Sequence, residues 1–234
     1  MTLSFNVHEK EPRGDYVLDV ASRHGFRSVR LSLSLPVFKA ANTFLPLEEL
    51  HEVAPWILRF CDAAEERGIA VQLDNAVPLC MFTEQQAGRL VLRGVLELRR
   101  NMRCEPVIDI GPDLNVWSCS CLSQLANRNL AAFRSLADAK DYFSGVWNVY
   151  QGAVYPMQKC WQCAHRERWG CQGGCLSYAI ATDGGRRYDR PPSEQERAPL
   201  PSPERGIALA DAVTLVRYDL PCESYLPSSS DTGG

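Results

Sequence analysis

The 234-residue sequence has no stretch that approaches the roughly 18 consecutive apolar residues needed for a membrane-spanning helix. It also lacks a strong net charge, because 25 basic and 28 acidic residues leave a formal charge of −3. This balance gives no electrostatic reason to expect binding to nucleic acid or to an anionic membrane surface. The N-terminal residues show no basic start, apolar stretch and cleavage site of a secretion signal. We therefore expect a globular, cytoplasmic protein with neither a nucleic-acid nor a membrane partner.

The sequence also lacks the motifs of several common enzyme classes, since it contains no P-loop, dinucleotide-binding fingerprint or Ser/His/Asp arrangement. Its four histidines are scattered too widely to form a ligand set. Cysteine is what the sequence has in abundance: of ten cysteines, seven lie between positions 104 and 175. In a reducing compartment, clustered thiols indicate metal or redox chemistry rather than disulfides.

The first hundred residues alternate between strand-like and helix-like patterns. Strands are predicted at 3–7, 29–35 and 69–74, and helices at 16–24, 46–68 and 83–98. Pro55 should kink or divide the second helix, and Thr83 with Gln86 forms a capping box that begins the third, whose apolar face runs from Ala87 to Leu98. This order predicts parallel strands with crossover helices. Because parallel sheets need covered faces and neighbouring strands, we expect part of the sheet to be missing or supplied by a partner.

The pattern changes after position 101. Residues 107–110 and 115–117 predict a β-hairpin around Gly111, with Cys104 before it and Cys119 at its end. Helical segments are expected at 131–133 and 136–150. From position 186 the chain is rich in Pro and Ser, which is typical of irregular structure, although an apolar island at 207–220 precedes Cys222.

The densest cysteine motif is Cys160-x2-Cys163-x7-Cys171-x3-Cys175. Two cysteines separated by two residues can place both sulfurs on one metal centre. The glycines at 173 and 174 would allow positive φ and a close approach of the backbone to a bulky cluster. The motif therefore indicates zinc–sulfur or iron–sulfur ligation without deciding between them; the alternative is four buried, inert thiols.

With Cys104, Cys119 and Cys222 added, the cysteine string resembles the SPASM (twitch-like) auxiliary-cluster domain at the C-terminus of radical S-adenosylmethionine (radical SAM) enzymes. That family's pattern is C-x9-15-G-x4-C, a gap, C-x2-C-x5-C-x3-C, a gap and a last C. The chain matches all seven cysteines in order. It departs at Leu114, which occupies the position of the glycine, and in having seven rather than five residues between Cys163 and Cys171.

The resemblance implies two 4Fe–4S clusters. Their expected ligands are Cys104, Cys119 and Cys175 for the first, and Cys160, Cys163, Cys171 and Cys222 for the second. The first set is one ligand short, and Cys80 and Cys121 are the remaining candidates. Cys80 follows the third predicted strand at the mouth position of a β/α barrel, whereas Cys121 lies only two residues from Cys119, an awkward spacing for the same cluster. An open iron site that meets substrate is the other alternative, and Cys61 is expected in the core.

The same resemblance implies that residues 1–100 are later β/α units of a partial radical SAM TIM-type barrel, an α/β fold. Residues 101–185 would form a small α+β SPASM-like domain, and 186–234 a mostly irregular tail that contributes Cys222. The earlier barrel units carry the family's C-x3-C-x2-C motif, which is absent here. We therefore expect the chain to be truncated, mis-started or one part of a split enzyme, with a separate chain supplying the N-terminal half barrel.

The function implied is that of an auxiliary-cluster portion of a radical SAM enzyme for peptide or protein modification. S-adenosylmethionine would bind only in the complete enzyme, and the chain alone would be inactive. Two alternatives remain open. One is a zinc-stabilised binding module with a site of Cys160, Cys163, Cys171 and Cys175, which leaves Cys104, Cys119 and Cys222 unexplained. The other is a stand-alone iron–sulfur electron carrier, which the barrel-like first hundred residues make less attractive.

Overall fold

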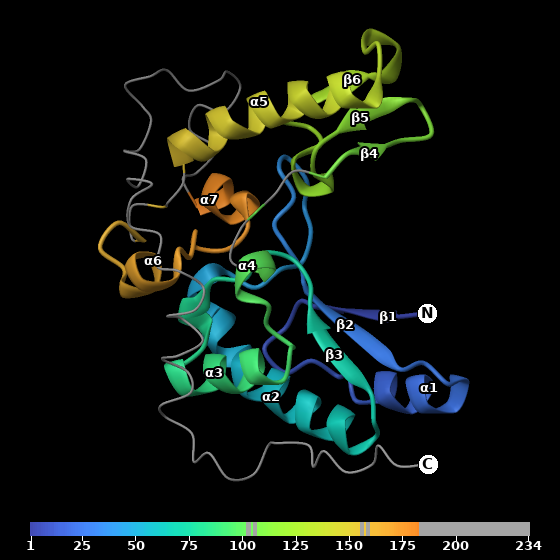
Figure 1. Cartoon of the computed structure of the whole chain (residues 1–234), viewed down its shortest axis with the longest axis vertical. Helices are drawn as coiled ribbons and strands as arrows, with labels where there is room; N and C mark the ends of the chain where they lie inside the picture. The colour runs from blue at the N-terminus through green and yellow to red at the C-terminus, as the bar shows by residue number, and fades with distance from the viewer. Residues whose placement is uncertain (102–103, 105–106, 155–156, 158–159, 183–234) are drawn as a thin grey trace, which may run out of the picture.

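A computed structural model describes residues 1–101, 104, 107–154, 157 and 160–182 (Figure 1). Cys222, the apolar island at 207–220 and the predicted tail lie outside the described residues. The N-terminal part contains, in chain order, β1 (Leu3–Val7), α1 (Tyr16–His24), β2 (Ser28–Leu33), the 3-10 helix η1 (Leu47–Glu49), α2 (Leu50–Glu66), β3 (Ala70–Leu73), the 3-10 helix η2 (Leu79–Met81), α3 (Glu84–Leu92) and α4 (Leu98–Asn101). The predicted alternation of strands and helices is confirmed.

The three strands form a parallel sheet in the order β1-β2-β3, so each strand pairs with the next one in the chain. Right-handed crossovers between strands added in one direction place all connecting helices on the same face. Figure 1 shows this arrangement, with α1, α2 and α3 on one side of the sheet. Among the helices of the described ranges, none combines the length and apolarity required to cross a membrane.

The two faces of this sheet differ in chemistry. The register aligns Leu3 with Val29 and Val71, and Phe5 with Leu31 and Leu73, in apolar rows that face the helices. The alternate rows are polar and contain Ser4, Asn6, Ser28, Arg30, Ser32 and Gln72. Asp74 follows on the polar face, where it accepts a hydrogen bond from Ser32 (Oγ to Oδ2, 3.3 Å) and pairs with Arg30 (3.8 Å). One face is therefore packed and the other is suited to water or a polar ligand.

Two features of the helices differ from expectation. Helix α2 is unbroken through Pro55, so of the two predicted effects of this proline, a kink or a division, the division does not occur. Pro55 is exposed and near the helix start, so its missing N–H leaves only the carbonyl of the exposed His51 without its usual helical partner. The predicted apolar face to Leu98 is wrong, since α3 ends at Leu92 and Gly94 (φ 68°) leads into the separate helix α4. The predicted capping box of Thr83 and Gln86 is confirmed.

The rest of the described chain contains a small antiparallel sheet, three α-helices and two 3-10 helices. Its elements are β4 (Asp109–Ile110), β5 (Asn115–Trp117), the 3-10 helix η3 (Ser120–Leu122), β6 (Asn127–Asn129), the 3-10 helix η4 (Leu130–Ala132), α5 (Leu136–Val154), α6 (Ala164–Trp169) and α7 (Leu176–Thr182). The predicted hairpin is confirmed as β4 and β5, and β6 adds a third strand that was not expected. Leu114 in the hairpin turn has φ 61°, so the turn keeps the left-handed backbone for which glycine is favoured.

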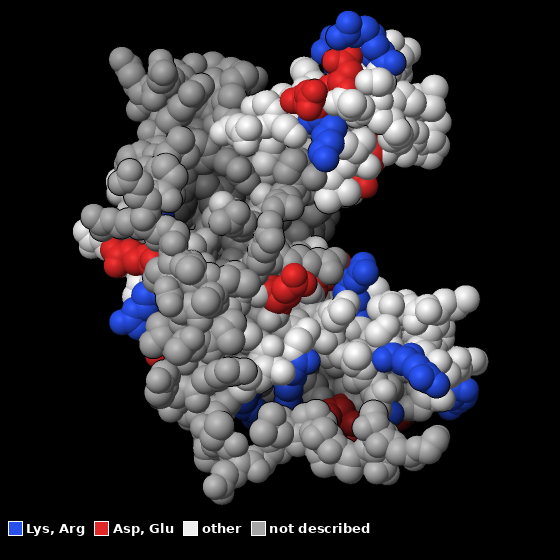
Figure 2. Space-filling view, viewed as in Figure 1, with Lys and Arg blue, Asp and Glu red and all other residues white. Residues whose placement is uncertain are grey.

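Helix α7 connects the two parts. Leu176, Tyr178 and Ile180 are buried in the same hydrophobic core as the strands and helices of the parallel sheet. The Tyr178 hydroxyl donates to the carbonyls of Ser34 (3.3 Å) and Leu45 (3.2 Å), in the segment that follows β2. The cysteine-bearing segment at the start of α7 is therefore seated at the carboxyl end of the parallel sheet. In Figure 2 the surface is hollowed between the small sheet and the parallel sheet.

Candidate metal centres

Four cysteines from three separate segments lie in the same part of the structure, as two pairs. Cys104 precedes the small sheet, Cys119 is the N-cap of η3, Cys121 lies within η3, and Cys175 lies directly before α7. The Sγ atoms of Cys104 and Cys175 are 3.8 Å apart, and the thiols of Cys119 and Cys121 act on each other's pKa. The two pairs are close enough to interact electrostatically, because a charge on Cys175 acts to raise the pKa of both Cys119 and Cys121. We name these four residues the first cysteine group.

Backbone and hydroxyl donors surround the sulfurs of the first group. The Leu176 N–H donates to Cys104 Sγ (3.5 Å), and the buried Ser177 hydroxyl donates to Cys175 Sγ (3.3 Å). The backbone N–H groups of Cys121 and Leu122 also lower the pKa of the Cys119 thiol. Such donors stabilise a thiolate, which is the form of cysteine that binds metals.

Hydrogen bonding within each pair separates the acidities of its two thiols. The bond from Cys104, together with donors from Ser177, lowers the pKa of Cys175 to about 7, while the same bond and burial raise the pKa of Cys104. The bond from Cys121 likewise lowers the pKa of Cys119, and raises that of Cys121. Each pair is therefore arranged to release a first proton more easily than an isolated cysteine.

Cys160, Cys163 and Cys171 form a second cysteine group around α6. The helix ends at Gly170 (φ 67°), and the chain returns so that the Cys171 N–H donates to the carbonyl of His165 (3.3 Å). Cys163 and Cys171 interact electrostatically, and burial raises the pKa of Cys171. The sulfur of Cys171 accepts from the N–H groups of Gly173 (3.4 Å) and Leu79.

Glycine is required where the two groups meet. Gly173 and Gly174 have φ values of 87° and 94°, so the positive φ predicted for both is confirmed. A β carbon on Gly173 would lie 3.0 Å from Cys160 Sγ, and one on Gly174 would lie 3.1 Å from Cδ of Pro78. The two glycines carry the chain from Cys171 in the second group to Cys175 in the first, although only three residues separate these cysteines.

The remaining cysteines lie elsewhere. Cys80 is exposed in η2, next to Leu79 and therefore beside the second group. Cys61 is buried in α2 within the core, as expected. No disulfide joins any two of the nine cysteines that the structure describes. In the same described ranges, no three Cys, His, Asp or Glu side chains converge closely enough to hold a single metal ion.

Both groups are positioned by segments that follow the parallel strands. The N–H of Phe38, after β2, donates to the carbonyl of Cys121 (2.8 Å). Leu79 and Pro78, after β3, contact Cys171 and Gly174. Carboxyl ends of parallel strands are the usual location of functional sites in α/β proteins. The cysteine groups occupy that edge of this sheet.

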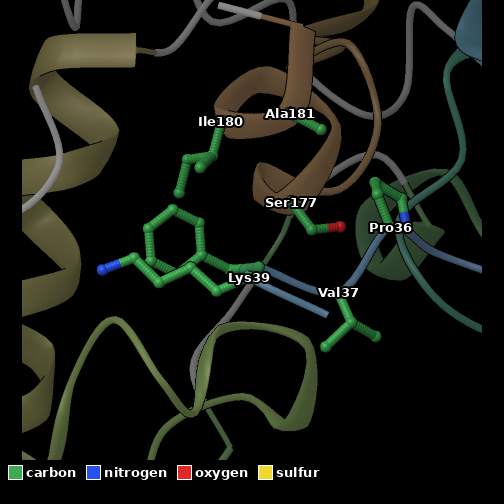
Figure 3. A pocket seen from close by; sticks show the side chains of 7 residues that line it. Pro36, Val37, Lys39, Ser177, Ile180 and Ala181 are labelled. Carbon is green, nitrogen blue, oxygen red and sulfur yellow. The ribbon is translucent and has the colours of Figure 1, made fainter. Parts of the chain in front are cut away.

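A cleft of about 280 Å³ adjoins the first group. It lies between the segment after β2 and α7, and it is lined by Pro36, Val37, Phe38, Lys39, Ser177, Ile180 and Ala181. Figure 3 shows Ile180 and Ser177 of α7 facing the Pro36–Lys39 side. Because Ser177 also donates to Cys175, a molecule in this mostly apolar cleft would lie one side chain away from a candidate metal ligand.

Ser177 and Tyr178 belong to the site but carry no signal in the sequence. Ser177 contacts a cysteine only because Cys175 precedes a helix, and Tyr178 is recognisable only through its distant carbonyl partners. Comparisons with protein-family models, with curated proteins and with solved structures find no match to this chain.

Proposed function

We propose that the chain binds two 4Fe–4S clusters and serves as the auxiliary-cluster portion of a radical SAM enzyme that modifies a peptide or protein. The observation that carries the proposal is the spatial division of the cysteines. Cys175 is paired with Cys104, which is 71 residues away, and not with its near neighbour Cys171. This is the assignment that the cysteine pattern of the family implies. Sulfur-only donor sets with N–H groups at the sulfurs fit iron–sulfur clusters.

The parallel sheet supports the assignment of residues 1–100 to a partial barrel. Strands added in sequence order with all helices on one face are the arrangement of a β/α barrel, whose inner face is enclosed when further strands are added. Here that inner face would be the polar one with Arg30, Ser32 and Asp74. In the proposal, a separate chain pairs along the outer edge of β1 and supplies the N-terminal half barrel with the C-x3-C-x2-C motif.

The clusters would anchor the substrate or pass electrons to it, and an apolar substrate side chain would enter the cleft between Val37 and Ile180. S-adenosylmethionine would be bound and cleaved only in the complete enzyme. Acidic and basic side chains are interspersed on the described surface seen in Figure 2, which favours a peptide over a polyanion as the partner.

The test is anaerobic purification of the full chain followed by reconstitution with iron and sulfide. The proposal predicts about eight iron and eight sulfide per chain, brown colour and no S-adenosylmethionine cleavage unless a chain with the C-x3-C-x2-C motif is added. Colourless protein that contains zinc and no acid-labile sulfide would overturn it. Cleavage of S-adenosylmethionine by the isolated chain would overturn the proposed division of labour between two chains.

One observation favours zinc as a second candidate. Two sulfurs on one tetrahedral ion are about 3.8 Å apart when each metal–sulfur bond is about 2.3 Å, and Cys104 and Cys175 have that spacing. Thiolates on different irons of a cluster lie farther apart, so cluster binding requires this pair to open. A zinc site of Cys160, Cys163, Cys171 and Cys175 would instead require Cys175 to turn away from Cys104. Metal analysis separates the two candidates.

A further inference from the structure

We propose that Cys121 is the fourth protein ligand of the first cysteine group, which is then a closed site of Cys104, Cys119, Cys121 and Cys175. The inference rests on the proposed function in assuming a metal centre at this group. It replaces both the alternative with Cys80 as ligand and the alternative with an open iron site.

The local backbone resolves the awkward spacing of Cys119 and Cys121. Cys119 has extended dihedral angles (φ −166°, ψ 128°) and is followed by the 3-10 turn η3, which the Leu122 N–H closes by donating to the Cys119 carbonyl (3.0 Å). In a continuous strand, the side chains at positions i and i+2 would point to the same face of the sheet but lie about 6–7 Å apart. The change from extended backbone to a tight turn instead lets the two thiols approach each other on one side of η3.

The segment after β2 ties the backbone of Cys121 to the rest of the group. The Phe38 N–H fixes its carbonyl at 2.8 Å, which ties η3 to the segment after β2. Phe38 also lines the cleft together with Ser177, which donates to Cys175 Sγ (3.3 Å), so Cys121 and Cys175 adjoin the same cleft. Cys121 therefore has a fixed backbone and a thiol near Cys119 and Cys175.

Cys80 has a different environment. It is exposed, and the preceding Leu79 N–H donates to Cys171, which places this turn beside the second group. A first group completed by Cys121 has a cysteine for every iron of a 4Fe–4S cluster. Such a site has no open position for substrate, so its role would be structural or electron transfer, and substrate would contact the protein wall of the cleft instead.

The test compares Cys121→Ser with Cys80→Ser in the full chain after anaerobic reconstitution. We expect Cys121→Ser to lose up to half of the iron and sulfide of the unsubstituted chain, or to give the electron paramagnetic resonance signal of a three-iron cluster. Cys80→Ser should retain the iron, sulfide and spectrum of the unsubstituted chain. Retention of the cluster in the second group would show that the Cys121→Ser variant is folded.

The outcomes distinguish this inference from the proposed function. If the unsubstituted chain holds two clusters and Cys121→Ser is indistinguishable from it, the proposed function stands and the inference is wrong. If the chain holds zinc without sulfide, the proposed function is wrong, but a loss of one zinc per chain in Cys121→Ser still supports Cys121 as a ligand. A chain that takes up neither iron nor zinc overturns both.

Discussion

Gly173 offers the most direct test of how the second cysteine group is packed. Its φ of 87° is unfavourable for any residue with a β carbon, and that carbon would lie 3.0 Å from Cys160 Sγ and 3.2 Å from Cε of Met157. The backbone strain of Gly173→Ala should cost about 1–2 kcal/mol. Overpacking against the cysteine should add about 1–3 kcal/mol. We therefore expect a loss of about 2–5 kcal/mol in the free energy of unfolding.

Gly170→Ala is the matched control. Gly170 also has a positive φ (67°), but a β carbon there would meet no atom within 4 Å outside its own neighbourhood, so only backbone strain should appear. Denaturant unfolding of the metal-free proteins measures both losses, and iron uptake should fall in Gly173→Ala but not in Gly170→Ala. Equal losses of stability and equal iron uptake in the two variants would refute the packing of Cys160 against Gly173.

Three further predictions concern stability. Thr83→Ala should lower the free energy of unfolding by about 1 kcal/mol, because Thr83 Oγ1 accepts from the Gln86 N–H (3.2 Å) at the start of α3; denaturant unfolding with no change would contradict the cap. Leu114→Asn should raise the free energy of unfolding by up to about 1 kcal/mol because Asn tolerates left-handed φ better and Leu114 is 53% exposed. A lower free energy of unfolding in the same assay would count against the turn geometry. Burial raises the pKa of Cys61 to about 12 from an ordinary value of 9.0. The neutral thiol therefore stabilises the folded state fully below pH 9, and this contribution to stability is lost as the pH rises toward 12. Relative to Cys61→Ala, the unsubstituted chain should lose about 1.4 kcal/mol per pH unit between about 9 and 12, and parallel pH profiles would refute this.

The elements that could be predicted from the sequence are those specified by neighbouring residues. The alternation in β1 and β2 and the capping box at Thr83 depend on contacts within a few residues, so both were predictable. The division considered at Pro55 does not occur because a helix tolerates proline at an exposed position near its start. Strand β6, with the sequence Asn-Arg-Asn, has no strand-like composition, and its conformation depends on pairing with β5.

The same distinction applies to the candidate site. The dense spacing of Cys160 to Cys175 predicts metal chemistry from the sequence, and the positive φ of the glycines at 173 and 174 was predictable as well. The grouping of Cys175 with Cys104 rests on the family pattern alone until the fold is known, because it spans 71 residues. The contact between Cys119 and Cys121 is local, but it depends on where an extended residue changes into a turn. Sequence spacing alone does not specify that change.

The polar face of the parallel sheet and the two cysteine groups are related through the segments that follow β2 and β3. These segments contact Cys121 and Cys171, and they begin where the polar rows of the sheet end at Ser32 and Asp74. A strand added beside β1 would extend the polar face, and successive strands would close it into a lumen whose mouth is bordered by the cysteine groups. In the proposed complete enzyme, a substrate held at that mouth would face Asp74 and Arg30 on one side and the cluster-bearing segment on the other. The proposal would account for a polar sheet face, unusual for parallel strands, next to cysteine-rich segments.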